Sequence, residues 1–222
     1  MLLIGATGFY GKYVLRELLS KESIGVLVVT RSGVEEKASD RVWNSLLSTI
    51  DRSSGTFEQH LEQLRHKFQM RVTVLDGNYD KERFGLSDEG KKSTIESHFA
   101  LLTSFIDYQL LASVEAVIFA GGLVNVLQHP DYLIEQSLPA LRECLQLCCI
   151  GSPKRFVFVS SLSVFVSSDD SPTILDEHLS IGDVYGANTG ATAISGYAIS
   201  KIVVEYLVEL AALHGIDVRV SK

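Results

Sequence analysis

The fold of this chain is decided near its amino end by the stretch Leu2-Leu3-Ile4-Gly5-Ala6-Thr7-Gly8-Phe9-Tyr10-Gly11. The three apolar residues at 2–4 predict a short strand. Residues 10–20 predict a helix, because their apolar side chains recur at helical spacing. A glycine-rich turn joins the two. A strand, a glycine turn and a helix in direct succession are typical of the first unit of a doubly wound α/β sheet.

The same alternation of short apolar runs and amphipathic stretches continues along the chain. Further strands are predicted at 25–30, 70–75, 116–119, 155–159 and 216–220, and helices at 92–111, 132–149 and 197–214. A charged helical insert occupies about 34–69 and breaks near 53–55, and 182–196 is predicted to be a flexible loop. The pattern predicts one Rossmann-type domain over 1–222, a parallel sheet with helices on both faces.

Composition excludes several classes of protein. The chain has 222 residues, 46% of them hydrophobic, and a net charge of -7, so it lacks the basic excess that a general nucleic-acid binder needs. We expect no membrane-spanning helix and no signal peptide.

The six histidines show no metal-ligand spacing, so no metal site is expected. Three clustered cysteines, an odd number, favour reduced thiols and a cytoplasmic location.

The glycine turn suits a bound pyrophosphate. One glycine permits a tight turn with positive φ, a second lets the backbone approach a phosphate, and a third lets the helix pack closely on the strand. The helix start adds unpaired N–H groups and the positive end of its dipole. The alternative is a turn that serves packing alone. We predict a dinucleotide site that includes Gly5, Thr7, Gly8, Phe9, Tyr10 and Gly11.

The residue that follows the second predicted strand indicates which dinucleotide is bound. An acidic residue there would accept hydrogen bonds from both ribose hydroxyls of NAD. This chain has Thr30-Arg31 instead, and a guanidinium suits the 2′-phosphate that distinguishes NADPH from NADH. We therefore expect NADPH, with NADH as the weaker candidate. The alternative for Arg31 is a solvated surface charge.

Tyr197 and Lys201 form the candidate catalytic pair. They lie four residues apart near the start of a predicted helix, so both side chains lie on one face. A phenol is a poor acid–base catalyst at neutral pH unless a nearby ammonium stabilises its charged form. Ser160 and Ser161 end the preceding predicted strand, at the sheet edge where ligands of parallel sheets bind. The alternatives are a tyrosine packed on the sheet and serines that only form a turn.

These segments stand in the order of the short-chain dehydrogenase/reductase superfamily, and the chain resembles its extended branch. Within that branch it is similar to the thioester reductase domains of peptide and polyketide synthetases and carboxylic acid reductases, and to the fatty acyl-CoA reductases. Three features carry this likeness: the insert after Arg31, the pair of motifs VLDGN and FGLSD at 74–78 and 84–88, and VIFAGGLVN at 117–125.

The resemblance implies a mechanism and assigns residues to it. Tyr197 would donate a proton, Lys201 would hold the nicotinamide ribose and lower the pKa of the phenol, and Ser161 would orient the carbonyl. Hydride transfer to an acyl thioester, bound to a carrier protein or to coenzyme A, would give a hemithioacetal that collapses to an aldehyde and a thiol. The resemblance also places five further residues along the cofactor: Gly77, Asn78, Ala120, Gly121 and Gly122.

The chain departs from the family at identifiable points. Asn78 stands where the family has an aspartate beside the adenine, and Ala120-Gly121-Gly122 stands where it has Asn-Ala-Ala. The family continues beyond the last strand into a substrate-binding region, which we expect to be missing here. Two other functions remain open: a sugar-nucleotide epimerase or dehydratase of the extended branch, and a non-catalytic NADP-binding sensor or scaffold module.

Overall fold

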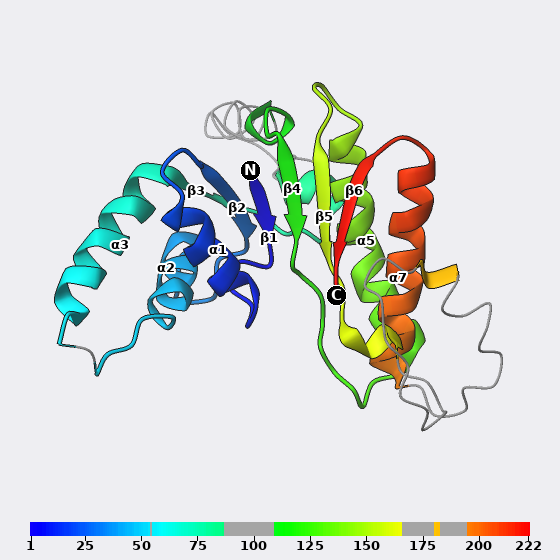
Figure 1. The fold of residues 1–222 in the computed structure, drawn as a ribbon, viewed down its shortest axis with the longest axis horizontal. Coiled ribbons are helices and arrows are strands. Elements are labelled where there is room, and N and C mark those ends of the chain that lie inside the picture. Colours follow the sequence, from blue (N-terminus) through cyan, green and yellow to red (C-terminus); the bar gives the residue numbers. More distant parts are fainter. Residues whose placement is uncertain (54, 87–108, 166–179, 183–194) are drawn as a thin grey trace.

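A computed structural model of the chain describes residues 1–53, 55–86, 109–165, 180–182 and 195–222. Its centre is a parallel sheet of six strands in the order β3-β2-β1-β4-β5-β6 (Figure 1). This order confirms the predicted Rossmann-type doubly wound fold. The strands are β1 (Leu2–Ile4), β2 (Val26–Thr30), β3 (Val72–Asp76), β4 (Ala116–Phe119), β5 (Arg155–Val159) and β6 (Asp217–Ser221).

Helices cover both faces of the sheet, as Figure 1 shows. One face packs on α1 (Gly11–Ser20), α2 (Ala38–Leu47) and α3 (Phe57–Arg71), and the other on α5 (Pro130–Cys148) and α7 (Gly196–Leu213). Two short 3₁₀ turns, η1 (Glu82–Gly85) and η2 (Leu162–Phe165), follow β3 and β5. Strand β1 serves both cores, because Leu3 packs with the first set of helices while Leu2 and Ile4 pack with the second.

The helical insert forms two helices, α2 and α3, and both its start and its end differ from the prediction. Residues 34–37 are not helical, and α2 begins at Ala38. Helix α3 runs on to Arg71, so β3 begins two residues later than predicted, at Val72. The guanidinium of Arg71 donates to the carbonyls of Leu19 and Lys21, which anchors the last turn of α3 on the end of α1.

Two predicted segments lie largely outside the described residues. The helix expected at 92–111 is described only from residue 109, and of the loop expected at 182–196 only residues 182, 195 and 196 are described. Within the described part of the chain, no helix is both long and apolar enough to cross a membrane.

Candidate active site

The glycine turn is as tight as the sequence predicts. Gly5 has a φ of +87°, and a Cβ there would lie 2.7 Å from the backbone of Ala120. A Cβ on Gly11 would lie 2.0 Å from the carbonyl oxygen of Gly5. The N–H of Gly8 donates to that same oxygen at 2.9 Å. The turn therefore leaves no room for side chains at positions 5 and 11, because backbone atoms of Ala120 and Gly5 occupy that space.

The start of α1 has the features of an anion site. The side chain of its N-cap residue, Tyr10, makes no capping hydrogen bond, and the first turn of the helix holds no acidic residue. Phe9 and Tyr10 are exposed, whereas Thr7 is half-buried and its carbonyl accepts from Ser45 on α2. The N–H groups of Lys12 and Tyr13 donate to the carbonyls of Gly8 and Tyr10, at 3.3 and 3.0 Å. What this helix start offers a phosphate is therefore mainly the positive end of the helix dipole.

Two arginines meet where β2 ends. Arg31 is exposed directly after the strand, and its carbonyl accepts a hydrogen bond from the guanidinium of Arg41 on α2. Sequence reasoning missed Arg41, because it lies ten positions after Arg31 and the contact forms only in the folded chain. Beside them, Ser32 donates to Asp76 from its N–H at 2.8 Å and from its hydroxyl at 2.7 Å. Two arginines and the carboxylate of Asp76, which accepts both hydrogen bonds of Ser32, therefore lie at this part of the sheet.

Gly77 and Asn78, which the resemblance assigns to the cofactor, directly follow β3. A Cβ on Gly77 would lie 2.6 Å from the carbonyl oxygen of Phe84, so this position also requires glycine. The side-chain oxygen of Asn78 accepts from the N–H of Asp80 at 3.1 Å and closes a local turn. Nearby, burial raises the pKa of Tyr79, with a smaller contribution from Asp80.

A cavity of about 240 Å³ lies at the carboxyl ends of β4, β5 and β6. It brings together residues from the predicted cofactor segments and the predicted catalytic helix. Gly122 has a φ of +137°, and a Cβ there would lie in ordinary van der Waals contact with the ammonium nitrogen of Lys201, at 3.8 Å. The cavity is lined by Tyr10, Ala120, Gly121, Gly122, Val124, Val159, Ser160, Tyr197, Lys201, Ser221 and Lys222.

Lys201 is held above the sheet edge by two contacts. Its ammonium donates to the carbonyl of Val159 at 3.1 Å and lies 5.1 Å from the centre of the Phe158 ring. Burial lowers the pKa of Lys201 to about 8, and the negative charge of Glu205 partly opposes that shift. Tyr197 begins the same helix face one turn earlier, so the predicted pair does line one cavity.

The two serines after β5 differ in their surroundings. Ser160 lines the cavity, and its hydroxyl hydrogen-bonds the carboxylate of the buried Glu205. The Ser161 oxygen accepts from the N–H and the hydroxyl of Ser163, at 3.2 and 2.9 Å. Ser161, the predicted catalytic serine, begins the η2 turn and is not among the residues that line the cavity.

A buried ion pair joins one of the cavity-lining residues to α7. Glu205 on α7 and Lys222 after β6 pair at 2.9 Å, with side chains 0% and 2% exposed. The Lys222 ammonium also lies 4.5 Å from the centre of the Phe165 ring. Sequence reasoning missed both residues. The four-residue spacing from Tyr197 to Lys201 to Glu205 was the available signal.

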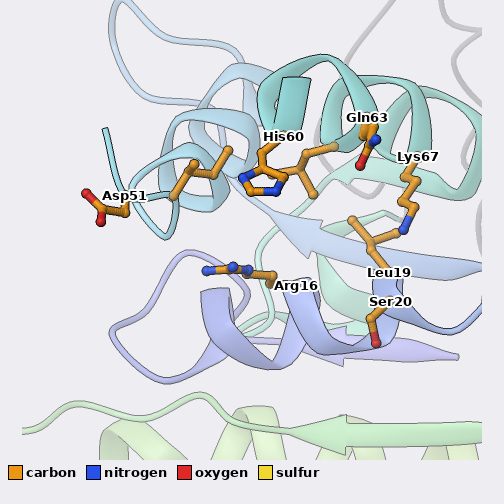
Figure 2. Close-up of a pocket in the computed structure, with 9 residues that line it drawn as sticks. Arg16, Leu19, Ser20, Asp51, His60, Gln63 and Lys67 are labelled. Carbon is orange, nitrogen blue, oxygen red and sulfur yellow. The ribbon is translucent and has the colours of Figure 1, made fainter. Parts of the chain in front are cut away.

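A second pocket, of about 360 Å³, lies between α1 and the segment that contains α2 and α3. Figure 2 shows His60 and Arg16 facing each other across it, with Lys67 farther along α3. None of its lining residues belongs to the predicted site. Among the residues that the structure describes, no group of histidine, cysteine and carboxylate side chains could hold a metal ion.

Comparison with known proteins finds relatives that are named as reductases and as synthases. It is 28% identical to L-2-aminoadipate reductase of Saccharomyces cerevisiae, over 96% of this chain and 14% of that protein. It is 25% identical to a linear gramicidin synthase polypeptide of Brevibacillus parabrevis, over 100% of this chain and 4% of that protein. The chain thus spans a small part of each of these relatives.

Solved structures give the same result at the level of the fold. The terminal R domain of the myxalamid PKS-NRPS pathway superposes with a TM-score of 0.70 and 25% identity, over 99% of this chain and 47% of that one. UDP-glucuronic acid 4-epimerase of Bacillus cereus superposes with a TM-score of 0.58 at 15% identity, a likeness of fold alone. A family model described as male sterility protein matches residues 3–222. The resemblance inferred from the sequence is therefore confirmed, and this chain belongs to the male sterility protein family of NAD-binding domains.

Proposed function

We propose that this chain is the cofactor-binding and catalytic part of an NADPH-dependent reductase that converts an acyl thioester to an aldehyde. The observation that carries the proposal is the cavity that Tyr197 and Lys201 of α7 line together with the glycine segment after β4 and Tyr10, which directly precedes α1. Two independent sequence motifs, one for a dinucleotide and one for proton transfer, thereby converge on one edge of the sheet.

The residues around the glycine turn fit a nicotinamide dinucleotide. Positions 5 and 11 have no space for a Cβ, and the uncapped start of α1 can receive the pyrophosphate. Arg31, with Arg41 beside it, would pair with the 2′-phosphate of NADPH. Gly121 and Gly122 would allow the nicotinamide end to lie close to Lys201. When bound, the dinucleotide supplies the hydride for the reduction.

The chain's own residues would then donate the proton and stabilise the charge that develops. The Tyr197 phenol donates its proton to the carbonyl oxygen of the thioester, and the Lys201 ammonium stabilises the phenolate that remains. Ser161 would donate its hydroxyl hydrogen to that same carbonyl oxygen, which is the role that the resemblance implies. Collapse of the hemithioacetal releases the thiol and the aldehyde.

The relatives support the class of reaction. One is named as a reductase of L-2-aminoadipate, and another as a synthase of linear gramicidin. An acyl group carried as a thioester, on a carrier protein or on coenzyme A, is the substrate that agrees with both and with the resemblance found in the sequence. We therefore propose an acyl carrier as the partner of this domain.

The test combines cofactor binding with turnover. NADPH and NADH are titrated in parallel by fluorescence, and NADPH consumption is then followed with a series of acyl-CoA thioesters while a hydrazine traps the aldehyde. We expect tighter binding of NADPH. Tyr197→Phe should lower turnover by about 10²-fold or more and leave the NADPH dissociation constant unchanged, because the phenol acts on the substrate.

Other outcomes would support the two other functions. If Tyr197→Phe changes nothing measurable and no thioester is consumed although NADPH binds, the chain is a binding module. If thioesters are inert and a UDP-sugar is turned over with NAD, the extended-branch alternative holds. Absence of binding by either dinucleotide would overturn the proposal as a whole.

A further inference from the structure

We infer that Glu205 is a positioning residue of this site: its carboxylate holds Ser160 and Lys222 against the turn of α7 that carries Lys201. The inference rests on the proposed function and deepens it, since it assigns a role to a residue that touches neither substrate nor cofactor. It starts from the burial of a charge. Glu205 is completely buried, and burial of a carboxylate is costly unless it is paired and hydrogen-bonded.

The contacts of Glu205 join three separate elements. One carboxylate oxygen pairs with the Lys222 ammonium at 2.9 Å, directly after β6. The other accepts from the hydroxyl of Ser160, directly after β5. The backbone N–H of Ser160 in turn donates to the carbonyl of Ser221 at 2.7 Å. Glu205 therefore ties the ends of β5 and β6 to α7 at one point.

That point lies one helical turn from Lys201. The Lys201 ammonium is held by the carbonyl of Val159, the residue immediately before Ser160. Displacement of Ser160 would thus move the carbonyl that orients Lys201. The charge of Glu205 also acts directly, because it favours the protonated form of Lys201 against the cost of burial. The other titratable groups on the cavity are Tyr10, Tyr197 and Lys222.

The test uses two variants that break the same ion pair. Glu205→Gln removes the negative charge, whereas Lys222→Met keeps it, and each leaves a buried charged group without its partner. A purely structural role predicts the same consequence for Lys201 in both. A positioning role predicts that the protonation equilibrium of Lys201 moves to lower pH in Glu205→Gln and does not do so in Lys222→Met.

The readout does not depend on catalysis. The protein is labelled with ¹⁵N-lysine, the Nζ signal of Lys201 is assigned with Lys201→Arg, and its chemical shift is followed against pH. If the midpoint moves down by one unit, the protonated fraction at pH 8 falls about fivefold while the fraction at pH 6 changes little. Where thioester reduction is measurable, kcat/KM of Glu205→Gln should show the same fall at pH 8.

Two controls keep the inference falsifiable. Glu205→Asp retains the charge, so Lys201 should titrate as in the wild type even if stability falls. Glu143→Gln alters another buried carboxylate, on α5, which accepts from the N–H of Arg83 at 2.8 Å and should leave Lys201 unchanged. An unchanged Lys201 titration in Glu205→Gln, or an equal shift in Lys222→Met, overturns the inference. A wild type that reduces no thioester would overturn only the proposed function.

Discussion

Burial of the Lys201 ammonium lowers the stability of the folded protein. This ammonium is desolvated at the sheet edge, and its pKa is lowered to about 8 from the ordinary value of 10.5. Below pH 8 the group is protonated in the folded and the unfolded chain, so the full cost of burying the charge is present. Between pH 8 and 10.5 only the unfolded chain remains protonated, and the contribution of this group to stability improves as pH rises.

Replacement of Lys201 by Met should therefore stabilise the protein. At pH 7 we expect the free energy of unfolding to rise by about 1–2 kcal/mol, after allowing for the lost hydrogen bond to Val159. The gain should shrink as pH increases from 8 to 10.5. Urea unfolding of both proteins across this range measures it. A gain that is constant with pH, or a loss at pH 7, contradicts the assigned burial of the charge.

Arg31 should decide between the two dinucleotides. Arg31→Ala removes a charge-assisted pair with the 2′-phosphate, so NADPH binding should weaken about 10- to 100-fold while NADH binding stays the same. Arg65→Ala, which removes an arginine that lies 5.5 Å from the Trp43 ring, is the matched control. Fluorescence titrations report both constants. Equal weakening of NADPH and NADH would mean that Arg31 acts through the fold and not through the phosphate.

At the scale of single residues, sequence predicts what depends on local spacing. Tyr197 and Lys201 could be paired from their positions on one helix, and Arg31 from its place after a strand. The same spacing places Glu205 on their helix face, but its contacts could not be predicted, because Ser160 and Lys222 follow β5 and β6 and meet it only in the folded chain. Arg41 was missed for the same reason.

At the scale of elements, the glycine turn makes the junction of β1 and α1 intolerant of change. Gly11→Ala would place a methyl group 2.0 Å from the carbonyl oxygen of Gly5, which is backbone and cannot move aside cheaply. We expect a loss of about 2–3 kcal/mol or more in the free energy of unfolding. Gly25→Ala is the control, because nothing lies within 4 Å of that position.

Both glycine variants are compared by urea denaturation and by NADPH titration. Gly25→Ala should stay within about 0.5 kcal/mol of the wild type and bind NADPH normally. If Gly11→Ala is as stable as Gly25→Ala, the turn relaxes around the added methyl group, and the fold does not require the close approach of Gly11 to Gly5.

The types of the described elements could be predicted, but their ends could not. Hydrophobic periodicity placed all six strands and the described helices, because burial on a sheet or a helix face imposes a period. The end of α3 was misplaced, because Arg71 extends the helix through hydrogen bonds to the end of α1. Such a tertiary contact has no local signature in the sequence.

At the scale of the whole molecule, the protection of backbone amides from hydrogen exchange should follow the order of the strands in the sheet. β1 and β4 lie at the centre of the sheet, with a neighbour on each side, whereas β3 and β6 are its edges. In hydrogen exchange we expect amides of β1 and β4 to exchange last and those of β3 and β6 first. Mass spectrometry of peptides from each strand measures this. If the amides of β3 and β6 exchange as slowly as those of β1, strand order does not determine local stability in this sheet.

The architecture itself follows from the sequence more directly than the site does. Alternation of strands and helices leaves a parallel sheet with right-handed crossovers as the main solution, and the glycine turn identifies which strand is first. The cavity depends instead on how the loops after β4 and β5 approach α7, which patterning does not determine.

The central position of β1 has a consequence for the newborn chain. Leu2 pairs with Leu27 on one side and with Val117 on the other. A ribosome adds roughly 5–20 residues per second, so the second partner emerges on the order of ten seconds after the first strand. During that interval the edge of β1 that later pairs with β4 has no partner, so an apolar strand edge is exposed. The centre of the sheet therefore cannot be completed before residues 116–119 have left the ribosome.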